Sequence, residues 1–597
     1  MHRGFVVPSL FQQWLIALAL PVAAVMVTGD NARAQAPAGG WTTPAGDVQG
    51  TRFSPLSQIN TTNVSQLVQE FQFRTGVEAG HEGAPLVIGS TMYMVGPFPN
   101  RLFALDLSRQ GAVRWIFNPR PDPRAQDKAC CDIVNRGAVY ANGKVIYNVL
   151  DNTTVAVNAV TGQAMWRTRL GDVATGQTMT MAPLVVGNKV FVGNSGGEMG
   201  VRGFIAALDV ESGKEVWRAW STGPDADVRI GPRFEPFYEK DKGDDLGTKT
   251  WPDQMWRRGG STVWGWITYD PQLNLLFHGT ANPGVWNPDM RPGDNKWSAS
   301  VFARDPNTGD AIWAYQMTPH DAWDFDGVNE NIVVNLDVGG VPRQLLVRFD
   351  RNGFAYTADR TSGELLVANN YVPVTWATGI DLKTGLPIED PAKRTREGEI
   401  VTNICPAAPG GKDQQPAAFS PKTGLFYVPT NNLCMDYEAL KALYFQGSPF
   451  VGAMVTMNAG PGGHRGEFMA WDAVAGRKVW GIKEMFPVWS GVLATAGDLV
   501  FYGTLDRSFK AVDARTGDVV FQTKLETGIV GHPMTFMGAD GKQRVAIYSG
   551  PGGWAAAVVP GNLSLDDPYA ALGAVGAMSD LPKFTAAGGA VHVFKIP

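Results

Sequence analysis

The sequence has few charged residues and few cysteines: 18% of its 597 residues carry a charge, and only four are cysteine. It lacks a Cys-x-x-Cys-His motif, which excludes a covalently attached haem c. It also lacks a Gly-x-Gly-x-x-Gly motif between a strand and a helix, so a nicotinamide-dependent enzyme has no support. The formal net charge of −5 argues against a nucleic-acid partner. After the first 34 residues, no stretch approaches the length of a membrane span.

The first 34 residues have the organisation of a secretory signal peptide. Arg3 gives a basic start, an apolar run extends from Trp14 to Val27, and Ala32-Arg33-Ala34 has the small-x-small form of a cleavage site. The apolar run is short for a membrane span, so a retained anchor is the less favoured alternative. We therefore expect the mature chain in the periplasm, where disulfides persist.

The rest of the chain has the composition of a large β-rich protein. It contains 70 Gly, 40 Pro and 19 Trp among all 597 residues, and 44% of the residues are hydrophobic. This amount of apolar side chain is ample for a large core. No low-complexity linker interrupts the sequence, so we expect residues 35–597 to form a single domain.

A repeat of about 50 residues sets the predicted architecture. Its pattern is alanine, any residue, Asp or Asn, then a glycine and a tryptophan, read as strand, Asp-x-x-x-Gly turn, strand. The first three tryptophans, Trp115, Trp166 and Trp217, are spaced by 51 residues. Clear or degenerate copies begin at Ala104, Ala156, Ala207, Ala303, Asp359, Ala470 and Asp513.

Units of this length that cannot bury their own sheet faces are typical of propeller blades. We predict an all-β fold, an eight-bladed β-propeller in which the tryptophan and glycine of each repeat dock neighbouring blades. Seven copies are visible, and we expect residues 41–56 to complete the eighth blade with the strand Val591–Ile596. A seven-bladed propeller is the nearest alternative. The longer gaps after Trp217 and Asp359 predict insertions on the ligand face.

Cys130 and Cys131 are adjacent. Neighbouring α-carbons lie about 3.8 Å apart, whereas a relaxed disulfide needs roughly 4.4–6.8 Å, so bonding the two would close a small strained ring. Such a ring is flat and apolar and suits contact with a planar ligand. Two unrelated thiols or half of a metal site are the alternatives. All four cysteines fit two bridges, 130–131 and 405–434, although counting alone does not separate the three pairings.

Oxygen-bearing side chains form several short motifs. Glu198 ends Asn-Ser-Gly-Gly-Glu, Asn282 precedes Pro-Gly, and Asp324 and Asp326 lie two residues apart, which in an extended segment places both on one side. Arg351 lies at a predicted tight turn. Turn chemistry alone explains each motif taken singly. Together, the Glu, Asn and Asp oxygens would suit a highly charged cation.

Together with Cys-Cys-Asp-Ile-Val-Asn-Arg-Gly, Pro-Gly-Asp-Asn-Lys-Trp and Asp-Ala-Trp-Asp-Phe-Asp, these motifs resemble the pyrroloquinoline quinone (PQQ)-dependent alcohol dehydrogenases. The resemblance runs from about residue 41 to residue 596 and is closest to the lanthanide-dependent methanol dehydrogenase type. It implies an eight-bladed propeller with the quinone on its axis. The Cys130–Cys131 ring would cover one face of the quinone, and Trp264 would stack on the other.

The resemblance also implies a set of site residues. The residues implied to bind PQQ oxygens and carboxylates, to contact the quinone or to line the cofactor are Glu82, Arg136, Thr180, Ser195, Gly196, Gly197, Glu198, Arg351, Asp413 and Trp489. Asp413 replaces an amide of the calcium-type relatives, which leaves its role open. The implied metal ligands are Glu198, Asn282, Asp324 and Asp326. The Asp326 position is small and uncharged in calcium-type relatives, and three carboxylates balance a trivalent ion, so we predict a lanthanide, with Ca²⁺ as the alternative.

The implied reaction is oxidation of methanol or another short primary alcohol to an aldehyde. Asp324 would act as general base and Arg351 would stabilise negative charge on the quinone oxygens, with Glu198 an open alternative for the base. The small run 555–559 leaves bulkier primary or secondary alcohols as an alternative. Electrons would pass to a periplasmic c-type cytochrome, and a homodimer is the implied assembly. A non-catalytic propeller scaffold and a calcium-dependent lactonase are the alternatives from other classes.

Overall fold

The computed structural model describes residues 39–130, 132–561 and 563–597, which belong to one compact unit. The predicted signal peptide and Cys131 lie outside the described residues. In the part of the chain that the structure describes, no helix is long and apolar enough to cross a membrane.

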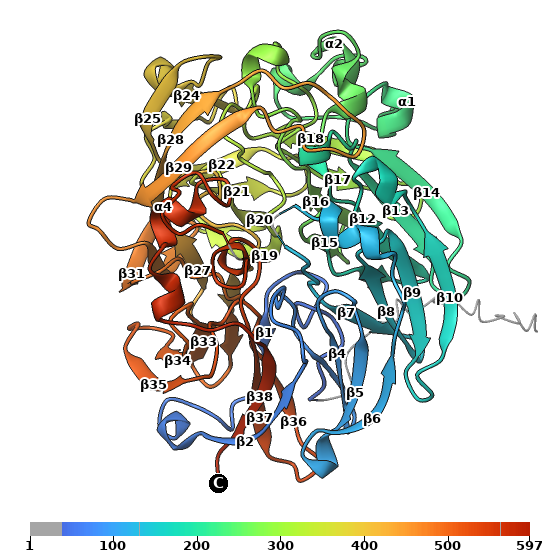
Figure 1. The fold of residues 1–597 in the computed structure, drawn as a ribbon, viewed down its shortest axis with the longest axis vertical. Helices are drawn as coiled ribbons and strands as arrows, with labels where there is room; N and C mark the ends of the chain where they lie inside the picture. The colour runs from blue at the N-terminus through green and yellow to red at the C-terminus, as the bar shows by residue number, and fades with distance from the viewer. Residues whose placement is uncertain (1–38, 131, 562) are drawn as a thin grey trace, which may run out of the picture. The chain divides into compact units, whose positions relative to one another are not determined.

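The described residues contain seven four-stranded antiparallel sheets and one five-stranded sheet, which follow one another around a common centre (Figure 1). The first four are β3 (Leu86–Ile88), β4 (Thr91–Val95), β5 (Leu102–Asp106) and β6 (Ala112–Phe117); β7 (Ala138–Ala141), β8 (Lys144–Val149), β9 (Thr153–Asn158) and β10 (Ala164–Arg169); β11 (Leu184–Val186), β12 (Lys189–Gly193), β13 (Phe204–Asp209) and β14 (Glu215–Trp220); and β15 (Ile267–Asp270), β16 (Leu275–Gly279), β17 (Ser300–Arg304) and β18 (Ala311–Gln316).

The other four sheets follow along the chain. They are β19 (Ile332–Val338), β20 (Val341–Phe349), β21 (Phe354–Asp359) and β22 (Leu365–Asn370); β26 (Ala418–Ser420), β27 (Leu425–Asn431), β30 (Gly466–Asp472) and β31 (Arg477–Glu484); β32 (Leu493–Thr495), β33 (Leu499–Gly503), β34 (Ser508–Asp513) and β35 (Val519–Lys524), joined in parallel by β1 (Phe53–Ser54); and β36 (Met534–Met537), β37 (Gln543–Ser549), β38 (Ala590–Lys595) and β2 (Val68–Arg74). This arrangement confirms the predicted β-propeller and is consistent with eight blades.

The blades are amphipathic from inside to outside. The inner strands β4 and β5 are apolar almost throughout and buried on both faces. The outer strand β10 alternates exposed and buried residues, and its buried tryptophan, Trp166, faces the next blade. Strands that neighbouring sheets enclose are expected to have continuous apolar sequences, whereas exposed edge strands alternate apolar and polar residues. The strands of this blade follow both patterns.

The tryptophans and glycines of the repeat dock the blades as predicted. A Cβ atom on Gly162 would lie 2.6 Å from the Trp115 ring, and one on Gly213 would lie 2.5 Å from the Trp166 ring. Trp166 also donates its indole N–H to the Val210 carbonyl oxygen at 3.1 Å. Each glycine thus provides the flat contact that receives the indole of the preceding blade. The same contact joins Gly309 to Trp217, Gly363 to Trp313 and Gly517 to Trp480.

Changing Gly213 to alanine is expected to lower the free energy of unfolding by about 1–3 kcal/mol more than changing Gly187 does. Both glycines have positive φ, +71° and +58°, so both alanine variants carry the left-handed backbone strain. Only at Gly213 does the new methyl group meet an indole, because nothing lies within 4 Å of a Cβ on Gly187. Denaturant unfolding of both variants measures the difference. Equal losses would contradict blade docking as the role of this glycine.

The eighth blade is closed by a different strand from the one predicted. Strand β2 (Val68–Arg74) pairs with β38, with Phe73 opposite Val591. Residues 41–56 instead form a bridge from Trp41 to Val87 and the short β1, which pairs with β32. The prediction was wrong because residues 41–56 are rich in turn-forming residues, whereas 68–74 alternates polar and aromatic side chains as a half-buried strand does.

The insertion predicted after Asp359 contributes a small cap. It contains the hairpin β23 (Ala377–Asp381) and β24 (Leu386–Glu389) and the sheet of β25 (Ile400–Ile404), β28 (Leu433–Ala439) and β29 (Ala453–Ala459). Helix α4 (Ala574–Met578) packs on β29 and contacts α3 (Trp554–Val558). The insertion after Trp217 carries the short helices α1 (Asp225–Val228) and α2 (Leu246–Lys249).

Candidate cofactor and metal site

A cavity of about 650 Å³, part of it open to solvent, brings together most of the predicted site residues. The predicted residues that line it are Glu82, Cys130, Arg136, Thr180, Ser195, Gly196, Glu198, Trp264, Asp324, Asp326, Arg351 and Asp413. They come from turns and loops far apart in the sequence, which converge because the inner ends of the blades meet around one centre. The structure thus brings these residues to one cavity, and their roles stay predictions.

Three of the described predicted residues, Asn282, Gly197 and Trp489, are not among those that line this cavity. Asn282 lies next to it, because a Cβ on Gly197 would come within 3.7 Å of its Oδ1 atom and its backbone N–H donates to Asp326 Oδ1 at 2.7 Å. Trp489 lies deeper and donates its indole N–H to Asn431 Oδ1 at 2.8 Å. Cys131 is outside the described residues, so the Cys130–Cys131 ring stays a prediction.

Three carboxylates surround the guanidinium group of Arg351. Its Nη1 atom lies 2.9 Å from Asp326 Oδ2 and 3.4 Å from Asp324 Oδ2, and its Nη2 atom pairs with Asp413 Oδ1. The Arg351 guanidinium also lies 5.5 Å from the centre of the Trp264 ring. All of the charged groups in this cluster are nearly fully buried. One cation therefore faces three anions in a place that water scarcely reaches.

The pKa values show the imbalance of charge. Burial, and then the negative charge of Asp326, raise the pKa of Asp324 well above its ordinary value. The same two causes raise the pKa of Glu198 to about 7. The Asp324 Oδ1 atom is buried and has no hydrogen-bond partner among the protein atoms described. A cation among these oxygens would remove both penalties, so the donor set fits a bound metal ion.

The wall of the cavity carries a second arginine. Arg136 Nη2 lies 2.8 Å from Glu82 Oε2, and its Nη1 donates to Thr180 Oγ1 at 2.7 Å, which lies 3.0 Å from Ser195 Oγ. The Arg136 guanidinium lies 4.7 Å from the centre of the Trp264 ring. Its Nε atom is buried without a hydrogen-bond partner in the described structure. This wall offers hydroxyl groups and a cation to an anionic ligand.

A model of the PQQ-type glucose, ethanol and alcohol dehydrogenase β-propeller domain matches residues 41–380 and 481–545. The chain belongs to the PQQ-dependent alcohol dehydrogenase family. It is 52% identical to the lanthanide-dependent methanol dehydrogenase of Methylacidiphilum fumariolicum (strain SolV) over 94% of this chain and 92% of that protein. It is 45% identical to methanol dehydrogenase (cytochrome c) subunit 1 of Methylorubrum extorquens over 93% of this chain and 91% of that protein.

The solved structure of a europium-containing methanol dehydrogenase has the same fold. Its TM-score is 0.92 at 51% identity, and the match covers 94% of this chain and 98% of that chain. The protein is thus a quinoprotein alcohol dehydrogenase, an oxidoreductase. Membership of this enzyme family sets aside the scaffold and lactonase alternatives considered from the sequence.

The cavity of this quinoprotein includes five residues that the sequence prediction did not name singly, although two of them lie in the segment 552–572, which we expect to bound the alcohol pocket. They are Val134, Thr178, Trp286, Gly553 and Trp554. Trp286 lies beside the Glu198 carboxylate and lowers its pKa, against the larger effects of burial and Asp326. The strings Asn-Pro-Gly-Val-Trp and Gly-Pro-Gly-Gly-Trp were the available signal, because a tryptophan after rigid turn residues is held at a fixed place.

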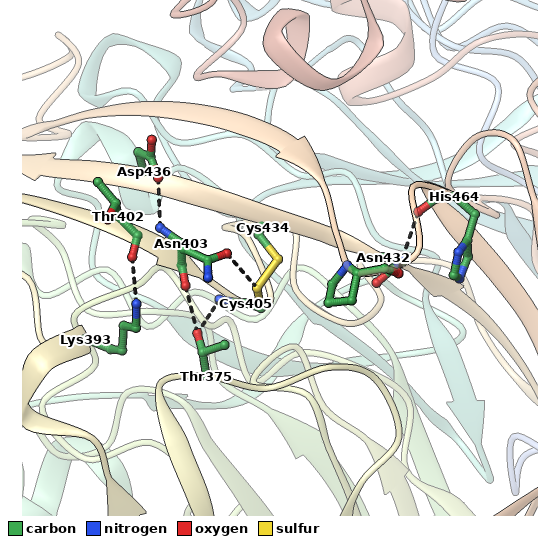
Figure 2. The surroundings of a disulfide bond; sticks show 10 residues. Thr375, Lys393, Thr402, Asn403, Cys405, Asn432, Cys434, Asp436 and His464 are labelled. Carbon is green, nitrogen blue, oxygen red and sulfur yellow. Dashed lines mark hydrogen bonds between the residues drawn. A yellow bond between two sulfur atoms is a disulfide. The ribbon is translucent and has the colours of Figure 1, made fainter.

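The disulfide between Cys405 and Cys434 lies in the cap (Figure 2). Figure 2 shows that Thr375 accepts the backbone N–H of Cys405 and donates to the carbonyl oxygen of Asn403. The chain continues from Cys405 to Ala408, whose carbonyl oxygen accepts a hydrogen bond from Arg351 Nη1 at 3.2 Å. The predicted 405–434 bridge is confirmed, and it anchors the segment that holds the quinoprotein's central arginine.

Replacing both Cys405 and Cys434 with serine is expected to lower the free energy of unfolding by about 3–4 kcal/mol in the chain-entropy model, because the bridge closes a loop of about 30 residues. We also expect a lower kcat, since the Ala408 carbonyl loses its anchor. Thermal unfolding and steady-state turnover of the holoenzyme check both effects. Thr375→Val, which removes two hydrogen bonds near the bridge but leaves the disulfide intact, is the control. A double variant with full stability would contradict the anchoring role.

Proposed function

We propose that this chain oxidises methanol or another short primary alcohol to the aldehyde, using PQQ and a lanthanide ion bound in the cavity between Trp264 and Cys130. The observation that carries the proposal is the buried excess of negative charge at Glu198, Asp324 and Asp326 beside Arg351. A further cation among the carboxylates would offset this excess and keep them ionised. The family and the named metals of its relatives support the same reading.

The cavity residues divide into two sets that suit the cofactor and the metal. Trp264 supplies a flat aromatic face, Cys130 lies in the cavity wall, and Arg136, Thr180 and Ser195 supply donors for the carboxylates and oxygens of PQQ. The polar contacts and the flat faces thus match a planar, acidic quinone. Glu82, Gly196, Gly197, Arg351, Asp413 and Trp489 complete or support the proposed cofactor site.

Glu198, Asn282, Asp324 and Asp326 would hold the metal. In the described chain, no three His, Cys, Asp or Glu side chains are grouped closely enough to form a metal site alone. The ion would therefore also need the Asn282 amide and oxygens from the cofactor or water. Three carboxylates neutralise a trivalent ion, which favours a lanthanide over Ca²⁺.

When bound, PQQ supplies the two-electron acceptor and the metal ion a Lewis acid. Asp324 accepts the hydroxyl proton of the alcohol, since this residue lines the cavity and its Oδ1 atom has no protein partner in the described structure. Arg351, 3.4 Å from Asp324, stabilises negative charge that develops nearby. Burial of these groups excludes bulk water and strengthens each electrostatic contact.

The tryptophans of the cavity favour a small alcohol. Trp286 and Trp554 line the cavity, whereas Ala555 and Ala556 are buried within α3 and do not. The small run 555–559 therefore packs the cap in a hydrophobic cluster rather than widening the cavity. This placement supports a short primary alcohol over the bulkier and secondary alcohols left open by the sequence.

Electrons would leave to a separate c-type cytochrome in the periplasm. The sequence has no haem attachment motif, and a relative is named for cytochrome c. The signal-peptide prediction for residues 1–34 places the chain in the same compartment. A homodimer remains the expected assembly.

Purified protein tests the proposal through its cofactor and its substrates. We expect the absorbance of bound quinone and methanol-dependent reduction of an artificial dye after loading with a lanthanide. A panel of primary and secondary alcohols then ranks the substrates by kcat/KM. Protein that binds no quinone, or that prefers secondary alcohols, would contradict the proposal.

A further inference from the structure

A buried histidine below the cofactor cavity has no role in the chemistry described so far. His532 is fully buried, and neither of its ring nitrogens has a hydrogen-bond partner among the protein atoms described. Its position is nevertheless fixed, because its backbone N–H donates to the Gly83 carbonyl oxygen at 3.0 Å. Buried polar atoms without partners are rare, since each costs about 1–3 kcal/mol unless water or a ligand satisfies it.

The imidazole ring occupies a shaped slot. Its centre lies 5.6 Å from that of the Trp266 ring, with the two planes inclined at 46°. A Cβ atom on Gly491 would lie 2.7 Å from His532 Cδ2, so a glycine at this position leaves room for the ring. Packing holds the ring in this slot, and no protein atom among those described satisfies either ring nitrogen.

This slot lies between two cavities. On one side, Gly83 follows Glu82 in the wall of the cofactor cavity, where Arg136 also lies. On the other side, Trp266 lines a second cavity, about 430 Å³ including space open to solvent, together with Arg52, Glu330 and Pro416. Arg52 Nη2 donates to the carbonyl oxygen of Pro533, the residue after His532, at 3.0 Å.

We propose that His532 is a proton-relay residue that, with a water molecule on each ring nitrogen, carries protons from the cofactor cavity to the second cavity. The proposal rests on the proposed function. Oxidation of a primary alcohol to an aldehyde releases two electrons and two protons; the electrons go to the acceptor, and the protons must reach solvent. For each proton, one ring nitrogen accepts a proton as the other releases one, and exchange of the tautomers restores the ring.

The surrounding charges suit transfer rather than storage of a proton. Burial, then the positive charges of Arg52, Arg136 and Lys412, lower the pKa of His532 well below its ordinary value. Arg136 faces Glu82, and Lys412 Nζ lies 2.6 Å from Glu330 Oε2, so carboxylates border both ends of the slot. An imidazolium ion would be short-lived here, and a proton that enters is passed on.

Two substitutions separate a relay from simple packing. His532→Phe keeps an aromatic ring against Trp266 but has no nitrogen, whereas His532→Gln keeps a donor and an acceptor for water but loses the ring. If His532 is a relay, the Phe variant of the PQQ- and lanthanide-loaded enzyme turns over at least about 10-fold more slowly than the Gln variant and shows a larger solvent deuterium isotope effect. Single-turnover oxidation of methanol, compared with deuterated methanol, is expected to be unchanged in both.

A packing role predicts the reverse order, so a Phe variant at least as fast as the Gln variant would overturn the relay. Wild-type enzyme that shows no alcohol-dependent turnover with loaded PQQ would instead refute the proposed function. If the Phe variant does not fold or retain PQQ, a high-resolution structure of the wild-type holoenzyme decides. Ordered water on both ring nitrogens is the expected result, and a dry ring or a direct protein partner on either nitrogen would end the proposal.

Discussion

Replacing Asp326 with alanine is expected to lower lanthanide-supported turnover by about 1000-fold, or about 4 kcal/mol of transition-state stabilisation. Asp326 supplies the third carboxylate that balances a trivalent ion, and its Oδ1 atom accepts the N–H of Asn282, another proposed ligand. The alanine variant therefore loses a ligand charge and the contact that orients Asn282. Its other partner, Arg351, stays in place through Asp413.

The measurement is turnover of metal-free enzyme loaded with PQQ and either a light lanthanide or Ca²⁺. Asp413→Asn is the matched control, because it also removes one buried carboxylate from Arg351 but none from the proposed metal set. Asp413→Asn is expected to keep the ratio of lanthanide to calcium activity, whereas Asp326→Ala collapses it. Wild-type activity with Ca²⁺ that equals or exceeds the lanthanide activity would refute the metal assignment.

The fold was predictable because its main contacts repeat locally. Each Trp–Gly contact, such as Trp166 with Gly213, joins consecutive repeats and recurs at a fixed spacing. Closure of the ring was not predictable in the same way. The pairing of Val68–Arg74 with Ala590–Lys595 joins the two ends of the chain, and no spacing links them. The alternation of polar and aromatic side chains in residues 68–74 predicts a strand, but the local sequence does not indicate which strand it pairs with.

The polar part of the site could be predicted and the apolar part could not. Glu198, Asp324 and Asp326 could be named because they lie in short oxygen-bearing motifs that together resemble a known family. Trp286 and Trp554 do not stand out in a chain with 19 tryptophans, most of which have packing roles. Their place in the cavity depends on how the cap packs, which is a long-range property of the fold.

The same lack of local signal explains His532. Its motif, Gly-His-Pro, is ordinary turn chemistry, and only the folded chain places the ring between two cavities. The alanines after Trp554 suggest space from the sequence, but small side chains widen a cavity only where they line it. Ala555 and Ala556 are buried in α3, which contacts α4, and they are not among the residues that line the cavity.

Replacing Asp324 with asparagine is expected to lower kcat by about 10²–10⁴-fold while PQQ and the metal stay bound. The amide keeps the shape and the ligating oxygen of the carboxylate but cannot accept the hydroxyl proton. Asp324 is favoured as base because Arg351 lies 3.4 Å from its Oδ2 atom, while its Oδ1 atom is buried without a protein partner in the described structure.

Glu198→Gln is the matched comparison, since burial and Asp326 raise the pKa of Glu198 to about 7, a value that also suits a base. If Asp324 is the base, Glu198→Gln weakens metal binding and recovers activity at high metal concentration, whereas Asp324→Asn does not recover. Metal titration of both variants, with bound quinone measured by absorbance, separates the two roles. Full turnover of Asp324→Asn with PQQ bound would assign the base to Glu198, because a group that takes the proton cannot be replaced by an amide without loss.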